Sequence, residues 1–115
     1  APGMVGLETA LAVTLGALTD GTGMTRRQVV GLMSWQPARI AGLSVEQGGD
    51  QGGPIVPGAP ANLCVFDPDE RWEVDPARLA SRSRNTPFAG RTLCGRVRHT
   101  VFAGEPVVID GEAQR

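Results

Sequence analysis

The sequence of 115 residues has no lysine, no tyrosine, one histidine, two cysteines and only 4% aromatic residues. Its 11 cationic residues, all arginine, are offset by 12 acidic ones, giving a formal net charge of −1. Nucleic-acid and acidic-membrane surfaces require a basic excess, so neither is an expected partner. Its apolar stretches are shorter than the roughly 20 residues of a membrane span, and its start lacks a secretory signal. We therefore expect one small cytoplasmic domain with a modest core.

The scarcity of metal ligands and nucleophile motifs argues against a complete catalytic centre. A hydrolytic metal site needs several converging ligands, whereas His99 stands alone and Cys64 and Cys94 are thirty positions apart. We expect His99 to face the core or a neighbouring loop, and both cysteines to be reduced and packed as small apolar residues. A Gly-x-Ser-x-Gly elbow and a P-loop lysine are also missing. Glu8 lies near the start of the first predicted helix, whose dipole would stabilise its carboxylate.

Glycine (16) and proline (9) are abundant and mark where elements end. Leucines at helical spacing predict a largely apolar helix over residues 6–18, followed by turn residues 19–23. The spacing of Thr25 and Gln28 predicts a capping box that starts a second helix. A proline in the first turn predicts a third helix over residues 37–43.

Residues 48–60 are dominated by Gly and Pro, which predicts a loop between a helical part and a β part. After this loop, short apolar or alternating runs between turn residues predict four strands. The sequence Asp-Pro-Asp at 67–69 is expected to end the first strand. Asp75 and Pro76 have the pattern of an N-cap followed by a first-turn proline. The strands are expected at 62–66, 71–74, 95–102 and 107–109.

Five segments, taken in order, resemble the C-terminal portion of cyclic amidohydrolases. Residues 1–10 (Ala-Pro-Gly-Met-Val-Gly-Leu-Glu-Thr-Ala) resemble the segment after the last metal-binding aspartate of the barrel. Residues 35–43 and 57–67 resemble the closing helix and the strand that enters a small β-sandwich, and residues 95–104 resemble the terminal hairpin. The sharpest match is at 82–90 (Arg-Ser-Arg-Asn-Thr-Pro-Phe-Ala-Gly), which resembles the Ser-x-x-Asn-Thr-Pro-Phe-x-Gly stretch of dihydroorotases.

The resemblance implies an α+β fold, in which the last helices of a TIM (β/α)8 barrel precede the C-terminal part of a small composite β-sandwich. The barrel helices are expected at residues 1–47, the connection at 48–60 and the sandwich part at 61–115. The match covers the whole chain but only the last quarter to third of such enzymes. We therefore expect a fragment that exposes an apolar face on its first helix and associates with the N-terminal part of the same enzyme.

The resemblance also implies a function in de novo pyrimidine synthesis. Dihydroorotases reversibly hydrolyse the cyclic amide of dihydroorotate to carbamoyl aspartate, with two zinc ions whose bound hydroxide attacks the amide carbon. The zinc ligands of this family lie on earlier barrel strands, so none is carried over to this chain. The substrate-contact positions that do match are Pro2 and Gly3, where a glycine lets backbone N–H groups approach a carboxylate. A simple turn before the helix is the alternative for these two residues.

Two other functions remain open at this point. The chain could be part of another cyclic amidohydrolase, such as an allantoinase, although the Asn-Thr-Pro-Phe sequence at 85–88 favours dihydroorotase. It could also belong to a non-catalytic, dihydroorotase-like subunit that scaffolds a partner enzyme. A homodimer or a complex with aspartate transcarbamoylase is the protein assembly that the resemblance suggests.

Overall fold

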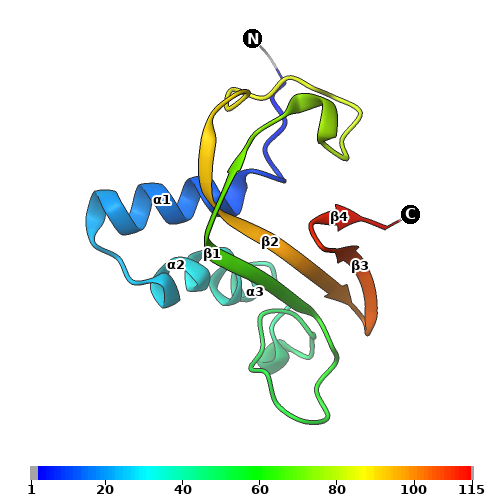
Figure 1. Ribbon diagram of the computed structural model, residues 1–115. Helices are drawn as coiled ribbons and strands as arrows, with labels where there is room; N and C mark the ends of the chain where they lie inside the picture. The colour runs from blue at the N-terminus through cyan, green and yellow to red at the C-terminus, as the bar shows by residue number, and fades with distance from the viewer. Residues whose placement is uncertain (1–2, 115) are drawn as a thin grey trace.

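The computed structural model describes residues 3–114 and places α-helices before an antiparallel sheet (Figure 1), which is the expected α+β order. Along the chain, the neighbouring strands pair in the order β1-β2-β3-β4. No helix within the described residues is long and apolar enough to cross a membrane. The helices are α1 (Ala10–Thr22), α2 (Arg26–Met33), α3 (Trp35–Ile40) and the short 3-10 turns η1 (Val45–Gln47) and η2 (Pro76–Arg78). The strands are β1 (Leu63–Glu73), β2 (Thr92–Phe102), β3 (Glu105–Ile109) and β4 (Glu112–Ala113).

Helix α1 begins later than the leucine spacing predicts. Residues 7–9 form a turn, and the hydroxyl of Thr9 donates to the carbonyl of Gly6 instead of capping the helix. The helix therefore starts at Ala10, and the predicted start at residue 6 is wrong. The cause is tertiary, because the segment before the helix is bonded to residues far along the chain.

Helix α1 also ends later than predicted, at Thr22 instead of residue 18. The hydroxyls of Thr19 and Thr22 each donate to the carbonyl four residues earlier at 2.6 Å, so these residues continue the helix instead of forming a turn. Gly23, with φ of +75°, then ends it in the left-handed conformation that favours glycine.

The second and third helices follow the local sequence signals more closely. In the capping box of α2, the Thr25 hydroxyl accepts a hydrogen bond from the backbone of Gln28 at 3.2 Å, and the Gln28 side chain accepts one from the backbone of Thr25 at 2.9 Å. This prediction is confirmed. Helix α3 starts at Trp35, two residues before the predicted start, and ends ahead of Gly42, which has φ of +75°.

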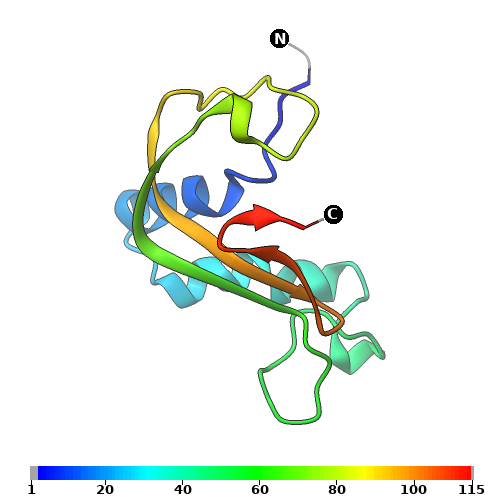
Figure 2. The ribbon, with the colours of Figure 1, turned by 45° about the vertical axis from the view of Figure 1, so that its right-hand side comes forward.

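Strand β1 is one long strand where two were predicted. Residues 67–69 do not end it; the pairing with β2 instead shifts register between Asp67 and Arg71, which is a bulge. Within the bulge, the side chain of Asp67 accepts a hydrogen bond from the backbone of Asp69 at 2.9 Å. The predicted break is wrong because β2 offers a continuous partner on both sides of the bulge. Figure 2 shows β1 and β2 curving together along their whole length.

Helix α1 packs against β2 at a glycine. Gly95 is buried with φ of +109°, and a Cβ at this position would lie 3.5 Å from Cδ1 of Leu15 and 3.7 Å from Cα of Ala12. The small core includes this contact. Its buried apolar residues are Ala12, Leu15, Val29, Ala38, Val74 and Leu79.

Exposed apolar side chains gather elsewhere than expected. Within residues 3–114 none of the large exposed ones lies in α1 itself, where Leu11, Val13 and Leu18 are half-buried, so the expected apolar face is smaller than predicted. The cause is that α1 packs against both β2 and α2. Leu7, just before α1, is 96% exposed. The other large exposed side chains around α2, α3 and the loop after them are Leu32, Met33, Ile40, Leu43, Val45, Ile55 and Val56.

The two cysteines lie on neighbouring strands as free thiols, but both are exposed. The expectation that they pack as small apolar residues is therefore wrong. The thiol of Cys94 donates a weak hydrogen bond to the carbonyl of Pro68 in the β1 bulge, at 3.4 Å. Surrounding protein atoms desolvate part of the Cys64 thiol and raise its pKa, and a hydrogen bond with the Thr100 side chain offsets part of this rise.

Candidate functional site

The start of the described chain lies beside the connection between β1 and β2 (Figures 1 and 2). We call residues 3–9 the N-terminal segment and residues 75–90 the connecting loop. The loop is closed at its base by two backbone hydrogen bonds, from Val74 to Arg91 at 2.9 Å and from Gly90 to Val74 at 2.8 Å. These bonds hold the two ends of the connecting loop together. The N-terminal segment beside it contains Gly3, one of the two predicted substrate-contact residues.

Asn85 of the connecting loop makes two hydrogen bonds to the N-terminal segment. Its side-chain Nδ2 donates to the carbonyl of Gly3 at 2.7 Å. Its backbone carbonyl accepts from the N–H of Val5 at 2.9 Å. Gly3 has φ of +79°, a conformation that favours glycine. Pro2, the other predicted substrate-contact residue, lies outside the described residues.

Glu8 makes a third contact between the same two segments. Its Oε2 accepts a hydrogen bond from the backbone N–H of Ala80 at 3.0 Å. Because α1 begins only at Ala10, Glu8 lies before the helix, and its carboxylate is held by the connecting loop. The predicted place of Glu8 within the first turn of the helix is therefore wrong.

The connecting loop has little regular structure but many internal hydrogen bonds. The Asp75 side chain accepts from the backbone of Ala77 at 3.0 Å and caps η2, as predicted. The guanidinium of Arg84 donates from Nη1 to the carbonyls of Pro76, at 3.1 Å, and Leu79. The backbone N–H of Leu79 also donates to the Pro76 carbonyl, at 3.4 Å, so Arg84 adds a second donor there and holds the end of the turn.

The Asn-Thr-Pro-Phe stretch is fixed by its threonine. Thr86 is 8% exposed, and its hydroxyl accepts a hydrogen bond from the backbone of Phe88 at 3.2 Å. The guanidinium of Arg91 lies 5.7 Å from the centre of the Phe88 ring, within cation–π range. The residue next to Asn85 is thus a buried anchor.

A hollow of about 1190 Å³ opens between the start of α1, the connecting loop, β2 and the β3–β4 hairpin. Charged side chains at its edge include Glu8, Arg78 and Arg96. The hollow is open on one side of the sheet, where the described chain supplies no second layer. Its apolar lining includes Leu11, Val74, Leu79, Val97 and Val108.

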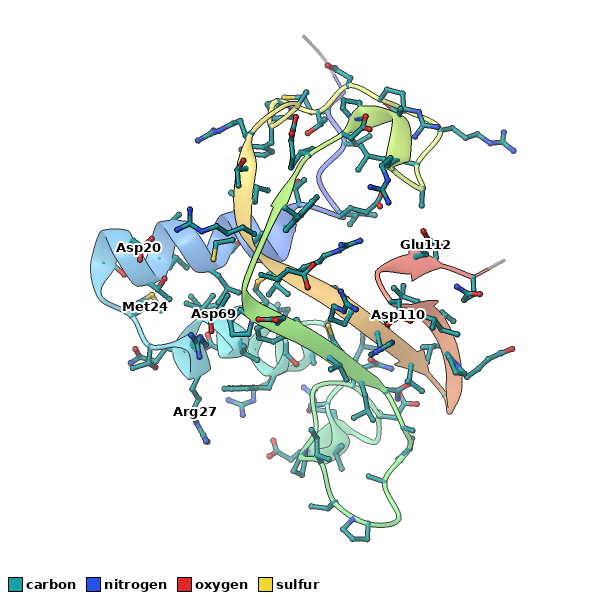
Figure 3. All side chains as sticks on the ribbon, in the orientation of Figure 1. Asp20, Met24, Arg27, Asp69, Asp110 and Glu112 are labelled. Carbon is teal, nitrogen blue, oxygen red and sulfur yellow. The ribbon has the colours of Figure 1, made fainter. Side chains whose placement is uncertain are left out.

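A cluster of charged side chains joins β1, β2 and the hairpin. Glu70 pairs with Arg96 at 3.2 Å and with Arg98 at 3.1 Å. Arg98 also pairs with Asp110, at the turn between β3 and β4 (Figure 3), at 3.4 Å. His99 accepts a hydrogen bond at Nδ1 from the backbone of Asp110 at 3.3 Å. His99 thus faces a neighbouring loop, which confirms one of the two expected settings.

The histidine, cysteine and acidic residues of the described chain do not gather into a metal site. Among residues 3–114, no group of three such side chains could hold a metal ion. These residues therefore do not fit a zinc centre, and no catalytic step through zinc is assigned to them.

The sequence predicts a substrate contact at Gly3 but gives no indication of the residue that holds Gly3 in the structure. Asn85 was singled out only as part of a motif, and Glu8 only as a helix-end carboxylate. The sequence feature that could have pointed to Asn85 is its place in residues 82–90, which match the dihydroorotase stretch most closely and have no helix or strand periodicity. The pairing itself joins residues 82 positions apart, which no local pattern indicates.

Comparison with known proteins places residues 3–108 in the amidohydrolase family. Among curated relatives, a dihydroorotase of Anaeromyxobacter dehalogenans is 43% identical over 100% of this chain and 25% of its own length. A dihydroorotase of Streptomyces coelicolor is 46% identical over 97% of this chain, and one of Mycobacterium tuberculosis is 43% identical over 96%. The chain spans 25% of the length of each of these relatives.

Solved structures agree on the fold. The L-hydantoinase of Arthrobacter aurescens superimposes with a TM-score of 0.82 and 26% identity, over 98% of this chain and 24% of its own. The D-hydantoinase of a Thermus species superimposes with a TM-score of 0.77 and 23% identity, over 99% of this chain and 24% of its own. With the family match covering nearly the whole sequence, this chain belongs to the amidohydrolase family.

Proposed function

We propose that this chain is part of a dihydroorotase, which reversibly hydrolyses the cyclic amide of dihydroorotate to carbamoyl aspartate in pyrimidine synthesis. The observation that carries the proposal is the contrast in identity within the family. Relatives named dihydroorotase are 43–46% identical over nearly the whole chain, whereas the L-hydantoinase is 26% identical. This contrast does not favour an allantoinase or another cyclic amidohydrolase.

In this proposal the chain contributes substrate binding through Pro2 and Gly3. Dihydroorotate is an anion, and a backbone with positive φ brings N–H groups close to a carboxylate without a Cβ in the way. Gly3 has that conformation, with φ of +79°, and among the described residues no atom beyond its chain neighbours lies within 4 Å of the place a Cβ would occupy. The peptide group at Gly3 is therefore open to a bound molecule on that side.

The proposal extends to the surroundings of the chain in the intact enzyme. Exposed Leu32, Met33, Ile40 and Leu43 suit burial by the rest of a (β/α)8 barrel, of which residues 1–47 would be the last helices. Residues 48–60 would connect to a β-sandwich part at 61–115. Strands from outside the chain would cover the open hollow and complete that sandwich.

Several parts of the proposal concern groups outside the described residues. Two zinc ions would be held by ligands elsewhere in the enzyme, since residues 3–114 do not fit a metal site. A homodimer, a complex with aspartate transcarbamoylase and a cytoplasmic location stay predictions. A non-catalytic scaffold subunit is the remaining alternative, because the residues that decide activity lie outside this chain.

The test is a substrate comparison with the full-length protein that contains this chain, purified with its bound metal. We expect it to hydrolyse dihydroorotate faster than hydantoin, dihydrouracil or allantoin, and to form dihydroorotate from carbamoyl aspartate in the reverse direction. Faster hydrolysis of one of the other three would overturn the assignment. A metal-loaded protein with no turnover of any of them would favour the scaffold alternative.

A further inference from the structure

We propose that Asn85 is a positioning residue for the backbone at Gly3. The statement that Gly3 contacts substrate rests on the proposed function. The statement that Asn85 fixes Gly3 rests on the hydrogen bonds of the structure.

The two bonds of Asn85 reproduce the pattern of a parallel β-bridge around Met4. In such a bridge, one residue donates to the carbonyl before its partner and accepts from the N–H after it. Here the carbonyl of Asn85 accepts from Val5 at 2.9 Å, as a strand residue would. The donor to Gly3 is the side-chain Nδ2, at 2.7 Å, in place of a backbone N–H. A two-point contact fixes both the position and the orientation of the segment.

This pattern explains why an asparagine is needed at position 85. The side chain must carry an N–H donor at a short reach from the backbone. Aspartate has the same shape, but its ionised carboxylate would face the carbonyl oxygen of Gly3 with no proton to share. Alanine removes the donor but keeps the backbone carbonyl that accepts from Val5, so the segment is held by one bond instead of two and the Val5 bond opens more often. The two substitutions therefore separate loss of the donor from added repulsion.

We call the two hydrogen bonds that join Asn85 to Gly3 and Val5 the clamp. Asn85 is itself held in place by its neighbours in the connecting loop. The next residue, Thr86, is buried and accepts a hydrogen bond from Phe88. The preceding residue, Arg84, donates to two carbonyls at η2. Glu8, bonded to Ala80, fixes the other end of the N-terminal segment to the same loop. The connecting loop thus determines the orientation of the Gly3 peptide group, and with it the contact to substrate.

The experiment uses the full-length enzyme with three variants. Asn85→Ala and Asn85→Asp test the clamp. Asn62→Ala is the matched control, because the Asn62 side chain also donates to one backbone carbonyl, of Asp50 at 3.1 Å, and accepts from one backbone N–H, of Ala103 at 2.8 Å. These partners lie outside the N-terminal segment and the connecting loop.

We expect Asn85→Ala to raise the KM for dihydroorotate about tenfold, the effect of losing roughly one net hydrogen bond, with kcat changed much less. Asn85→Asp should raise KM further, whereas Asn62→Ala should leave it unchanged. If all three variants alter KM alike, or if neither Asn85 variant alters it, the proposal is overturned.

A second readout keeps the clamp testable without turnover. Hydrogen exchange at the Val5 amide, measured on the same full-length proteins, should be faster in Asn85→Ala and Asn85→Asp and unchanged in Asn62→Ala. If the wild type fails to hydrolyse dihydroorotate, the proposed function fails, and the exchange result alone decides the clamp. Unchanged exchange at Val5 in both Asn85 variants would overturn it.

Discussion

The indole N–H of Trp72 donates a 2.7 Å hydrogen bond to the carbonyl of Gly95, the residue of β2 on which α1 rests. The bond crosses from β1 to β2 beside the bulge at residues 67–69, where the regular ladder is interrupted. A side chain therefore supplies the pairing that the backbone lacks at the point where helix and sheet meet.

Gly95→Ala is expected to destabilise the protein by about 1–2 kcal/mol, because an L-residue is strained at positive φ. The space itself is not the obstacle, since the nearest atoms would be at ordinary contact distances of 3.5–3.8 Å. The measurement is thermal or denaturant unfolding of the full-length protein. The matched control is Gly21→Ala, at an exposed position within α1, where the new Cβ would meet no described atom within 4 Å apart from its chain neighbours and the adjacent backbone of the helix. Gly21→Ala should leave the free energy of unfolding unchanged or raise it. Equal decreases in the two variants would contradict the explanation by backbone strain at Gly95.

Glu70→Gln is expected to cost about 1 kcal/mol, because Glu70 pairs with two arginines in a partly shielded place. The Glu70 side chain is 25% exposed, against 83% for Asp69, whose single ion pair is with Arg26 at 3.4 Å. Asp69→Asn should therefore change stability by less than about 0.5 kcal/mol.

Added salt provides the check on this comparison. Rising ionic strength screens exposed charges more than shielded ones, so the Asp69 effect should vanish first. A larger loss for Asp69→Asn than for Glu70→Gln at low salt would contradict the expected order.

The Cys64 thiol is expected to react slowly with iodoacetamide for an exposed cysteine. Its pKa is raised by desolvation, so less of the reactive thiolate is present near neutral pH. The pH at which alkylation of the Cys64 peptide becomes half-maximal, followed by mass spectrometry, should lie above that of free cysteine. Thr100→Val removes the hydrogen bond that lowers this pKa and should move the profile further upward.

The same shift has a consequence for folding. The pKa of Cys64 is higher in the folded than in the unfolded chain, so the contribution of this group to stability is present below the unfolded pKa. It is lost as the pH rises through the folded pKa. If the pH of half-maximal alkylation at Cys64 is equal to or lower than that of free cysteine, the raised pKa is contradicted. The expected slow reaction and the expected loss of stability at high pH would then both have no basis.

The 115-residue chain alone is expected to hydrolyse no dihydroorotate, with or without added zinc. Its described residues hold no group of three His, Cys, Asp or Glu side chains suited to a metal ion. The measurement is a dihydroorotase assay on the purified chain beside the full-length protein. Activity above background that persists through repurification would contradict this expectation.

The sequence predicted a structural feature correctly where the hydrogen bonds that form it join residues close together in the chain. The capping box at Thr25 and the N-cap at Asp75 are each specified by neighbours within a few residues. The absence of a helix or strand at residues 48–60 could be predicted from their Gly and Pro content alone. These features follow from backbone geometry that a short stretch of sequence determines on its own.

Distant partners explain where the sequence was a poor guide. Residues 7–9 lie in the predicted helix but form a turn, because Glu8 is bonded to Ala80 and Val5 to Asn85. Residues 67–69 have turn chemistry but remain within β1, because β2 pairs on both sides of them. For the site, the sequence pointed to Gly3 through a resemblance and missed the residue that holds it. In each of these places tertiary contacts override local preference.

The separation of 82 residues between Gly3 and Asn85 also sets an order of events during synthesis. A ribosome adds about 5–20 residues per second, so Gly3 is incorporated about 4–16 s before Asn85. Until then the first residues lack the contact that shapes them, and the turn at 7–9 competes with the helix favoured by its leucines. Closing so long a loop is slow relative to local helix formation. Within this chain, the N-terminal segment is therefore synthesised before the connecting loop and reaches its final conformation only after it.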